Sequence, residues 1–299
     1  MLYKYMTFQR AHVLLTTRHI RLTQPCDFND PFELHPEFQL MSREDIAALP
    51  PAIDENGEVI KGMRQLTPEA MQSMLSAVLP HIARIQSAYQ QFPEASFAID
   101  NNAVGRDYYA RNFGILSLTE APDNLLMWAH YADSHRGVVI GFDESHAFFQ
   151  GQDIVAGLPR LNRVEYNLKR PVLSVSTREH PKVFLRKSPD WAYEMEWRLI
   201  RPLTESNIST VREGLVPLCL FDIPTGAIRR VITGAQMIGS EYREICQIIG
   251  INSIYSHVLV HHALLSKEHY ELEIHPALTE AEQQRRLAGR AMSAKPLDI

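Results

Sequence analysis

The second half of the chain consists of short apolar segments separated by turns, and this pattern limits the possible folds more than any other feature. These segments have the lengths and residue types of strands. They are Gly114–Leu118, Gly137–Phe142, Arg163–Tyr166, Glu194–Ile200, Leu215–Phe221, Arg229–Thr233, His257–His261 and Tyr270–His275. We expect only two helices among them, Asn124–Ala132 with Asp123 as its N-cap and Ser240–Ile249 with Gly250 as its stop signal. Since strands and helices do not alternate regularly, the pattern predicts an α+β fold with a mixed or antiparallel sheet core.

The first half of the chain carries mostly helix signals. A short strand is expected at Leu2–Met6 and a helix at Phe8–Thr16. Thr67, followed by a proline, has the features of a helix N-cap, and that helix should run to about Gln91. We therefore expect a single α+β domain over residues 1–278, with a helical insertion at about 40–105. A C-terminal helix and tail should follow at 279–299.

The composition excludes several classes of protein. Of the 299 residues, 45% are hydrophobic and 22% are charged, which is typical of a globular chain rather than a disordered one. The formal net charge of -5 argues against a protein that binds nucleic acid over its whole surface. Its three widely spaced cysteines form no disulfide framework, and no apolar run approaches the roughly 20 residues needed to cross a membrane. We expect a cytoplasmic protein with no membrane partner.

One predicted strand combines charge with apolar and aromatic residues. With a period of two, Glu194, Glu196 and Arg198 share one face of the Glu194–Ile200 strand, and the alternate face has the residues of a core. Burying an unpaired carboxylate costs several kcal/mol. This face must therefore meet water, a partner charge or a ligand. A Glu–Arg ladder on a solvated strand is the structural alternative.

Two further segments could take part in a site. Phe28–Glu33 is a turn in which Asn29 and Asp30 either bond their own backbone or line the rim of a cleft. In the helix at 124–132, Trp128 and Tyr131 lie three residues apart, so they are neighbours in the core or at a ligand.

The sequence resembles a bacterial family, domain of unknown function 2971, through four blocks that occur in order. They are LYKY at residues 2–5, FNDPFE at 28–33, LMWAHYAD with HRGVVIGFD at 126–143, and WAYEMEWR at 191–198. The resemblance runs from Leu2 to about residue 275. The family has no assigned activity, so this resemblance implies a grouping and not a function.

A more distant resemblance is to the ADP-ribosyltransferase superfamily, which includes DNA-modifying toxins. In those proteins a first strand carries a His or Arg that holds NAD, a second carries a Ser-Thr or Tyr element beside nicotinamide, and a late strand carries the catalytic Glu. The matching positions in this chain are Tyr3, Lys4 and Tyr5, then Ser117 and Thr119 with Tyr131, then Glu194 and Glu196. Lys4 replaces the expected His or Arg, although Arg10, His12 or Arg18 could substitute for it in space.

This resemblance implies an enzyme that consumes NAD as its substrate. The catalytic residues would be Glu196, Glu194 and Tyr131, because a fixed carboxylate stabilises an oxocarbenium-like transition state. Tyr131 or Trp128 would stack on the pyridinium ring, and Arg198 would hold a phosphate or orient Glu196. The remaining NAD-binding residues would be Tyr3, Lys4, Tyr5, Asn29, Asp30, Ser117, Thr119 and His130. We expect no metal, a protein or nucleic-acid acceptor, and a role as a toxin or anti-phage defence effector.

Two other functions remain open. A metal-dependent nuclease or phosphodiesterase needs carboxylate-held divalent ions. Its ligands would come from Asp30, Glu33, His130, His135, Glu194 and Glu196. Alternatively, the chain is a non-catalytic partner-binding module, in which the same residues form only salt bridges.

Overall fold

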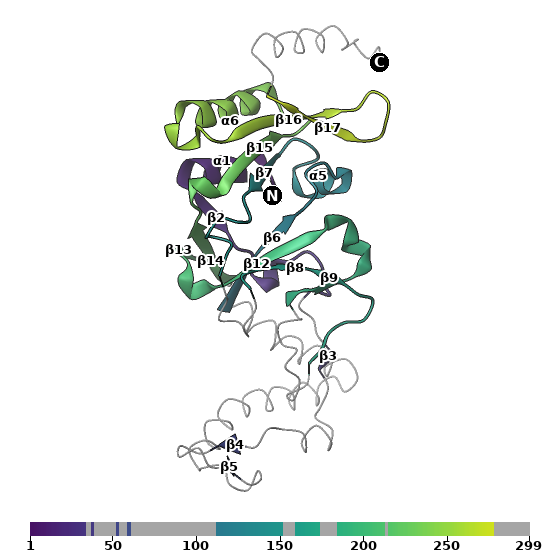
Figure 1. Cartoon of the computed structure of the whole chain (residues 1–299), viewed down its shortest axis with the longest axis vertical. Coiled ribbons are helices and arrows are strands. Elements are labelled where there is room, and N and C mark those ends of the chain that lie inside the picture. The colour runs from purple at the N-terminus through teal and green to yellow at the C-terminus, as the bar shows by residue number, and fades with distance from the viewer. Residues whose placement is uncertain are drawn as a thin grey trace.

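The centre of the molecule is a mixed sheet of eight strands. The structure is a computed structural model that describes residues 1–33, 37–38, 52–53, 59–60, 112–151, 159–173, 184–212 and 215–277. In spatial order the strands are β17 (Leu272–Pro276), β16 (Leu259–Leu265), β15 (Ile228–Thr233), β7 (Val138–Phe142), β1 (Leu2–Met6), β6 (Phe113–Thr119), β12 (Glu196–Pro202) and β8 (Leu161–Arg163). Neighbouring strands are antiparallel except β15 and β16, which are parallel. The predicted α+β class with a mixed sheet is confirmed (Figure 1).

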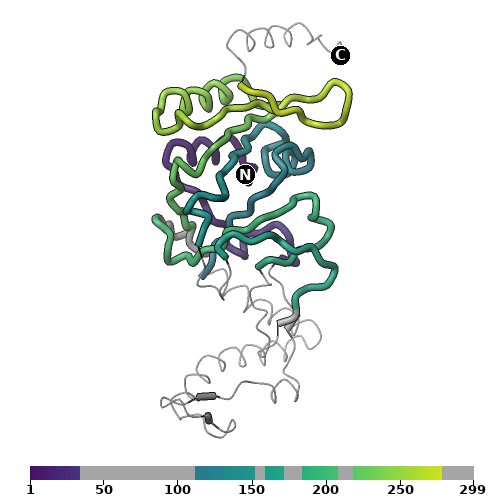
Figure 2. The backbone as a smooth tube through the Cα atoms, in the orientation of Figure 1, coloured from purple at the N-terminus to yellow at the C-terminus, as the bar shows by residue number. Residues whose placement is uncertain are grey.

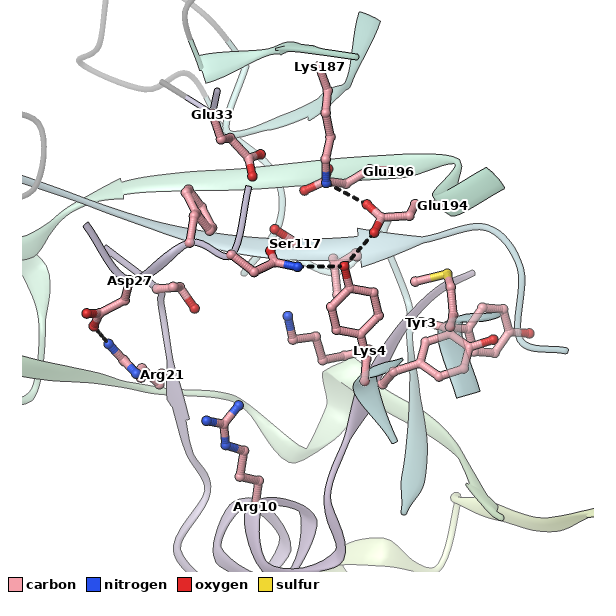
Figure 3. Close-up of a pocket in the computed structure, with 17 residues that line it drawn as sticks. Tyr3, Lys4, Arg10, Arg21, Asp27, Glu33, Ser117, Lys187, Glu194 and Glu196 are labelled. Atoms are coloured by element: carbon pink, nitrogen blue, oxygen red, sulfur yellow. Dashed lines mark hydrogen bonds and ion pairs between the residues drawn. The ribbon is translucent and has the colours of Figure 1, made fainter. Parts of the chain in front are cut away.

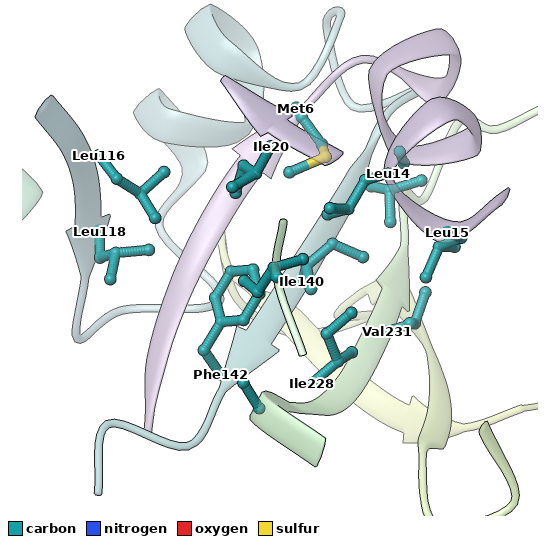
Figure 4. Close-up of a cluster of buried hydrophobic side chains, with 14 of the residues drawn as sticks. Met6, Leu14, Leu15, Ile20, Leu116, Leu118, Ile140, Phe142, Ile228 and Val231 are labelled. Atoms are coloured by element: carbon teal, nitrogen blue, oxygen red, sulfur yellow. The ribbon is translucent and has the colours of Figure 1, made fainter. Parts of the chain in front are cut away.

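Helices cover both faces of this sheet. On one face, α1 (Phe8–Thr17) and α6 (Gly239–Ile251) pack on alternate residues of the central strands, such as Ile140 and Val231 (Figure 4). On the other face, α5 (Leu125–Tyr131) packs through Trp128 against the second set of alternating residues. Burial of this apolar surface on two faces is the main source of stability in such a layered fold.

The sheet is divided in the middle. Strand β1 pairs with β7 at five residue positions, and β6 pairs with β12 at seven. By contrast, β1 and β6 pair only at Tyr3 and Thr119. Beyond that point β1 and β6 separate. The half of the sheet that ends in β1 and the half that begins with β6 are therefore joined by strand pairing at this one position. The N-terminal strand lies close to the middle of the fold in Figure 2.

Short strands form smaller sheets around the central one. Strands β13 (Ile208–Arg212), β14 (Leu215–Asp222) and β2 (His19–Arg21) make a three-stranded sheet. The two-stranded sheets pair β9 (Glu165–Tyr166) with β11 (Arg186–Lys187), β3 (Glu37–Phe38) with β10 (Val172–Leu173), and β4 (Ala52–Ile53) with β5 (Val59–Ile60). Short 3-10 helices connect several strands: η1 (Pro25–Asp27), η4 (Pro189–Glu194), η5 (Leu203–Glu205), η6 (Thr225–Ala227) and η7 (Ser253–Tyr255). Within the described residues, no helix has both the length and the apolar character to cross a membrane.

Several predicted element ends differ from the structure, among them those of the strands expected at Arg163–Tyr166 and His257–His261, and three of the differences have a clear local cause. The N-cap of α5 is Asn124 and not Asp123, because the Asn124 side chain accepts a hydrogen bond from the backbone of Met127. Helix α6 continues past Gly250 to Ile251, since Gly250 does not adopt the left-handed conformation of a C-cap. The predicted strand at Glu194–Ile200 begins only at Glu196, because Met195 has a left-handed backbone with φ of 42°.

The predicted helical insertion and C-terminal helix fall mostly on residues that the structure does not describe. The helical insertion at 40–105 is described only at the short strands β4 and β5, and the expected helix from Thr67 lies outside. The C-terminal helix and tail at 279–299 also lie outside the described residues.

Candidate functional site

A cavity of about 250 Å³ lies where β1 and β6 separate. Residues from both faces of the sheet reach it, since Arg10 comes from α1 (Figure 3) and Tyr131 comes from α5. Its lining residues are Tyr3, Lys4, Tyr5, Arg10, Arg21, Thr23, Asp27, Phe28, Asn29, Glu33, Ser117, Leu118, Met127, Tyr131, Lys187, Glu194 and Glu196. The cavity therefore joins segments that are far apart in the sequence.

Two carboxylates on one wall of the cavity share a single ammonium group. Lys187 Nζ lies 2.7 Å from Glu194 Oε2 and 3.2 Å from Glu196 Oε2. Glu194 ends η4 and Glu196 begins β12, with the left-handed Met195 between them. All three charged side chains are at most 5% exposed. The partner charge that the sequence required for the two carboxylates is thus Lys187.

A guanidinium group holds Glu196 from behind. Arg198 Nε lies 2.9 Å from Glu196 Oε1, and Arg198 Nη2 lies 3.0 Å from Glu196 Oε2. Arg198 also forms an ion pair with Glu33 and donates to the backbone carbonyl of Phe184 at 2.7 Å. We call Glu33, Lys187, Glu194, Glu196 and Arg198 the buried ion-pair network. Such a bidentate contact fixes the position of the carboxylate more firmly than a single hydrogen bond does.

Burial and charge shift the pKa values of this network in opposite directions. Burial raises the pKa of Glu196, and the Lys187 ammonium opposes that rise. For Lys187, burial favours the neutral amine, but Glu196 and Glu194 outweigh it and raise its pKa. Burial lowers the pKa of Arg198 to about 9, so this guanidinium remains protonated at neutral pH. The network therefore keeps its cations charged within the protein.

A phenol hydroxyl connects the carboxylates to the rim of the cavity. Tyr131 donates a hydrogen bond to Glu194 Oε1 at 2.7 Å and accepts one from Asn29 Nδ2 at 3.4 Å. Burial, followed by the hydrogen bond to Glu194, raises the pKa of Tyr131. The phenol thus stays protonated and fixes the direction in which the Glu194 carboxylate points.

Two cations on the cavity wall have no such partners. Neither Lys4 nor Arg10 makes an ion pair or side-chain hydrogen bond with any residue that the structure describes. Burial lowers the pKa of Lys4 to about 8, although the nearby Glu196 carboxylate favours its charged form. Arg21, by contrast, is engaged by Asp27. The cavity therefore combines paired carboxylates with two unpaired basic groups.

The structure brings together many of the residues predicted for the site. The predicted residues that line the cavity are Tyr3, Lys4, Tyr5, Asn29, Ser117, Tyr131, Glu194 and Glu196. Of the proposed substitutes for a basic residue on the first strand, Arg10 lines the cavity. His12 forms an ion pair with Glu244, and Arg18 caps the end of α1.

Five other predicted residues do not line the cavity. Trp128 is fully buried and donates to the Pro122 carbonyl, with its ring against Tyr5. His130 is exposed on the outer side of α5. The other three are also buried. They are Asp30, which accepts from the Phe32 backbone, Thr119, which accepts from the Ala121 backbone, and Arg198 behind Glu196.

Several cavity residues were not predicted from the sequence. Lys187 is the most important of them, because it pairs with both carboxylates. It lies only a few residues before the WAYEMEWR block, next to Arg186, so the local cluster of opposite charges could have indicated it. Arg21, Asp27 and Phe28 also line the cavity, but no spacing in the sequence relates them to the carboxylates.

The residues predicted as ligands of a catalytic metal ion do not all lie together. Within the described part of the chain, no group of three or more His, Cys, Asp or Glu side chains could hold a metal ion. His135 stacks on Trp128, away from the cavity lining. Glu194 and Glu196 already accept from cationic side chains, so a metal ion would compete with Lys187 and Arg198 for their oxygens.

One family of known proteins matches part of the chain. Residues 127–199 match a family described as "Protein of unknown function (DUF2971)". This match confirms the family resemblance over a segment that contains α5, β7 and Glu194 to Leu199. Comparisons with curated proteins and with solved structures gave no match.

Proposed function

We propose that this protein binds NAD in the cavity and cleaves the bond between nicotinamide and ribose. ADP-ribose would pass to water or to a protein or nucleic-acid acceptor. The observation that carries the proposal is that one cavity holds two fixed carboxylates, Glu194 and Glu196, together with Lys4 and Arg10, two cations that form no ion pair with a described residue. NAD has complementary chemistry, since it carries a cationic ring at one end and a pyrophosphate near its middle.

The carboxylates match the charge that develops during this reaction. Departure of nicotinamide leaves positive charge on the ribose, as in glycoside hydrolysis. A preorganised negative group stabilises that charge more strongly than it stabilises the ground state. Glu194 is held by Tyr131 and Lys187, and Glu196 by Lys187 and Arg198. Neither carboxylate has to reorganise when the bond breaks.

The other walls fit the remaining parts of the ligand. Lys4 and Arg10 would bind phosphate oxygens, because both are cations that no described residue contacts by an ion pair or side-chain hydrogen bond. The Tyr131 ring offers a face for the pyridinium, a contact worth roughly 0.5–2 kcal/mol. A volume of about 250 Å³ accommodates nicotinamide with its ribose, and the rest of the dinucleotide would extend out of the cavity.

The same arrangement is less suited to metal-dependent phosphodiester cleavage. Carboxylates that bind divalent ions keep their negative charge for the metal. Here Lys187, Arg198 and Tyr131 contact the oxygens of Glu194 and Glu196, and among the described residues no third His, Cys, Asp or Glu completes a metal site with them. The cationic groups that remain favour an anionic ligand and not a metal cation.

The wider role follows from resemblance to the toxins of the ADP-ribosyltransferase superfamily. We propose a cytoplasmic toxin or anti-phage defence effector that depletes NAD or modifies a macromolecule. Expression of the wild-type protein in a bacterial host should then slow growth and lower cellular NAD, and expression of Glu196→Gln should do neither.

The direct test measures nicotinamide released from NAD by purified protein. We expect Glu196→Gln and Glu194→Gln each to lower kcat by about 100-fold or more, because glutamine keeps the size of the side chain but not its charge. Tyr131→Ala should chiefly raise KM, since it removes a stacking surface. Glu268→Gln is the matched control, because Glu268 is exposed and outside the cavity, and it should leave both constants unchanged.

Thermal unfolding of each variant separates a catalytic role from a structural one. If the activity of Glu196→Gln falls only as much as its folded fraction at the assay temperature, Glu196 has a structural role and not a catalytic one. If the wild-type protein neither binds NAD nor releases nicotinamide, the proposal is wrong. Cleavage of a nucleic acid only with added magnesium or manganese would instead establish the nuclease.

A further inference from the structure

Lys4 occupies a strand position that normally takes an apolar residue. It lies on β1 between Leu2 and Met6, which share its face of the strand and are buried in the core beside α1. A lysine at such a position loses hydration of its ammonium group, which favours the neutral amine. Its hydrocarbon stem can pack in the core, but the terminal nitrogen needs a polar environment.

The cavity supplies that environment, and no residue in the described part of the chain forms an ion pair or hydrogen bond with the Lys4 ammonium group. Figure 3 shows the Lys4 side chain reaching into the space between Arg10 and Ser117, with no dashed contact. The titratable and charged groups around it come from every neighbouring element. They are Arg10 of α1, Arg21 of β2 paired with Asp27, Glu33, Tyr131 of α5, Lys187 of β11, Glu194, and Glu196 of β12, with Tyr3 and Tyr5 of β1 itself.

We propose that Lys4 is a nucleophilic amine that condenses with a small phosphorylated aldehyde. The amine, the cavity and the neighbouring cation Arg10 carry this inference, and it does not depend on the proposed cleavage of NAD. Lysines activated for imine formation are typically desolvated and lie next to a second cationic group. Lys4 meets both conditions, because it is partly buried and Arg10 lines the same cavity.

The reaction needs no oxidant, reductant or cofactor. The lone pair of the neutral Nζ attacks the aldehyde carbon, and the carbonyl oxygen takes up a proton to give a carbinolamine. The nitrogen then loses a proton, and the hydroxyl group takes up a proton and leaves as water. A carbon–nitrogen double bond forms as a protonated imine, which releases the second nitrogen proton. Glu194, hydrogen-bonded to Tyr131, can receive and return the proton within the cavity. Amine and aldehyde thus give imine and water.

The phosphate requirement follows from Arg10. Its guanidinium lines the cavity and makes no ion pair with a described residue. A phosphate group bound there would place an attached aldehyde near Lys4 and would compensate the positive charge around the amine. The cavity of about 250 Å³ is large enough for a three- to five-carbon sugar phosphate.

Reductive trapping with mass-spectrometric peptide mapping tests the proposal on the full chain. The probe is D-glyceraldehyde 3-phosphate with cyanoborohydride, which converts the imine into a stable secondary amine. At pH 7.5 the Lys4 peptide should be labelled at least about 10-fold faster than the peptide of Lys169, an exposed lysine outside the cavity. Its labelling rate should rise with pH to a plateau above about pH 8, where Lys4 is neutral.

Two controls make the test decisive. Glyceraldehyde without phosphate should label Lys4 about 10-fold more slowly than the phosphorylated probe, and Arg10→Gln should remove that preference. Arg243→Gln, on the exposed side of α6, should keep it. Equal labelling of Lys4 and Lys169, or equal labelling of Lys4 by the two aldehydes, would overturn the proposal. Because the wild-type peptides are compared directly, neither result depends on a variant that folds or on NAD turnover.

Discussion

At the scale of single residues, the site is defined by which charges are paired and which are not. The buried ion-pair network satisfies its own charges through three cation–carboxylate contacts around Glu194 and Glu196. Lys4 and Arg10 remain without ion-pair partners among the described residues. In such a site the carboxylates are held in fixed positions, and the two basic side chains are available to bind an anionic ligand.

Removal of Arg198 should destabilise the protein strongly. Arg198→Met leaves Glu33 without its ion pair and takes one of the two cations from Glu196, and breaking a buried pair costs roughly 3–5 kcal/mol. The free energy of unfolding in urea measures this loss, with Arg243→Met as the exposed control. A loss below about 1 kcal/mol would contradict a structural role for the network.

Lys4 should have the opposite effect on stability. Its pKa is lowered to about 8 in the folded protein, below the ordinary value of 10.5, so the folded state gives up a proton that the unfolded state keeps. The free energy of unfolding therefore increases as the pH rises from about 8 to 10.5. Below pH 8, the protonated Lys4 lowers the free energy of unfolding by its full amount. We expect Lys4→Met to stabilise the protein at pH 7 by about 1–3 kcal/mol.

The pH dependence supplies the check on this expectation. The difference in melting temperature between Lys4→Met and the wild-type protein should shrink as the pH is raised from 8 to 10. A difference that stays constant over this range would mean that packing, and not the charge of Lys4, causes the effect.

The sequence predicted several properties of these residues but not their partners. A row of carboxylates on an apolar strand requires water, a ligand or an opposite charge, and the structure provides Lys187. The distinction between Trp128 and Tyr131 could not be predicted, because both lie on the sheet-facing part of one helix. Only the position of α5 relative to the cavity decides that Trp128 enters the core and Tyr131 lines the site.

At the scale of elements, strand positions were easier to predict than their ends. Apolar runs indicated β6, β7, β14 and β15 almost to the residue, because burial on a sheet requires such runs. The start of β12 depends on a left-handed Met195, which no residue preference indicates. That turn places Glu194 on η4 and Glu196 on β12, where both reach Lys187.

The N-cap of α5 allows a matched test at this scale. Asn124 accepts from the Met127 backbone at 3.1 Å, and its amide also donates to the Tyr193 carbonyl at 3.1 Å. Asn124→Ala should therefore lower the free energy of unfolding by about 1–2 kcal/mol. Asp123→Ala, one residue earlier and exposed, should change it by less than about 0.5 kcal/mol. Equal effects of the two substitutions would contradict the assigned cap.

At the scale of the whole molecule, the division of the central sheet should be visible in its dynamics. Strands β1 and β6 pair at one position, whereas each pairs fully with its other neighbour. Amides of β1 and β6 that face the cavity should exchange with solvent at least about 10-fold faster than amides between β6 and β12. NMR-detected hydrogen exchange measures this, and uniform protection across all eight strands would contradict a divided sheet.

The fold class was predictable at this scale, but the assembly of the site was not. Short strands without regular alternation of helices indicated an α+β sheet, and the structure has one. Which strands become neighbours depends on packing over the whole chain. Neither the adjacency of β1 and β6 nor the cavity between them can be read from local residue patterns.

The central place of the first strand has a consequence for synthesis of the protein. Residues 2–6 leave the ribosome well before their partner strands, residues 113–119 and 138–142. At roughly 5–20 residues per second, β1 therefore waits on the order of 5–30 s before either partner exists. During that time a lysine-bearing strand and its helix α1 have no sheet to join. The middle of the sheet can form only after residue 142 has been translated, and the cavity only after Glu196, which lines it.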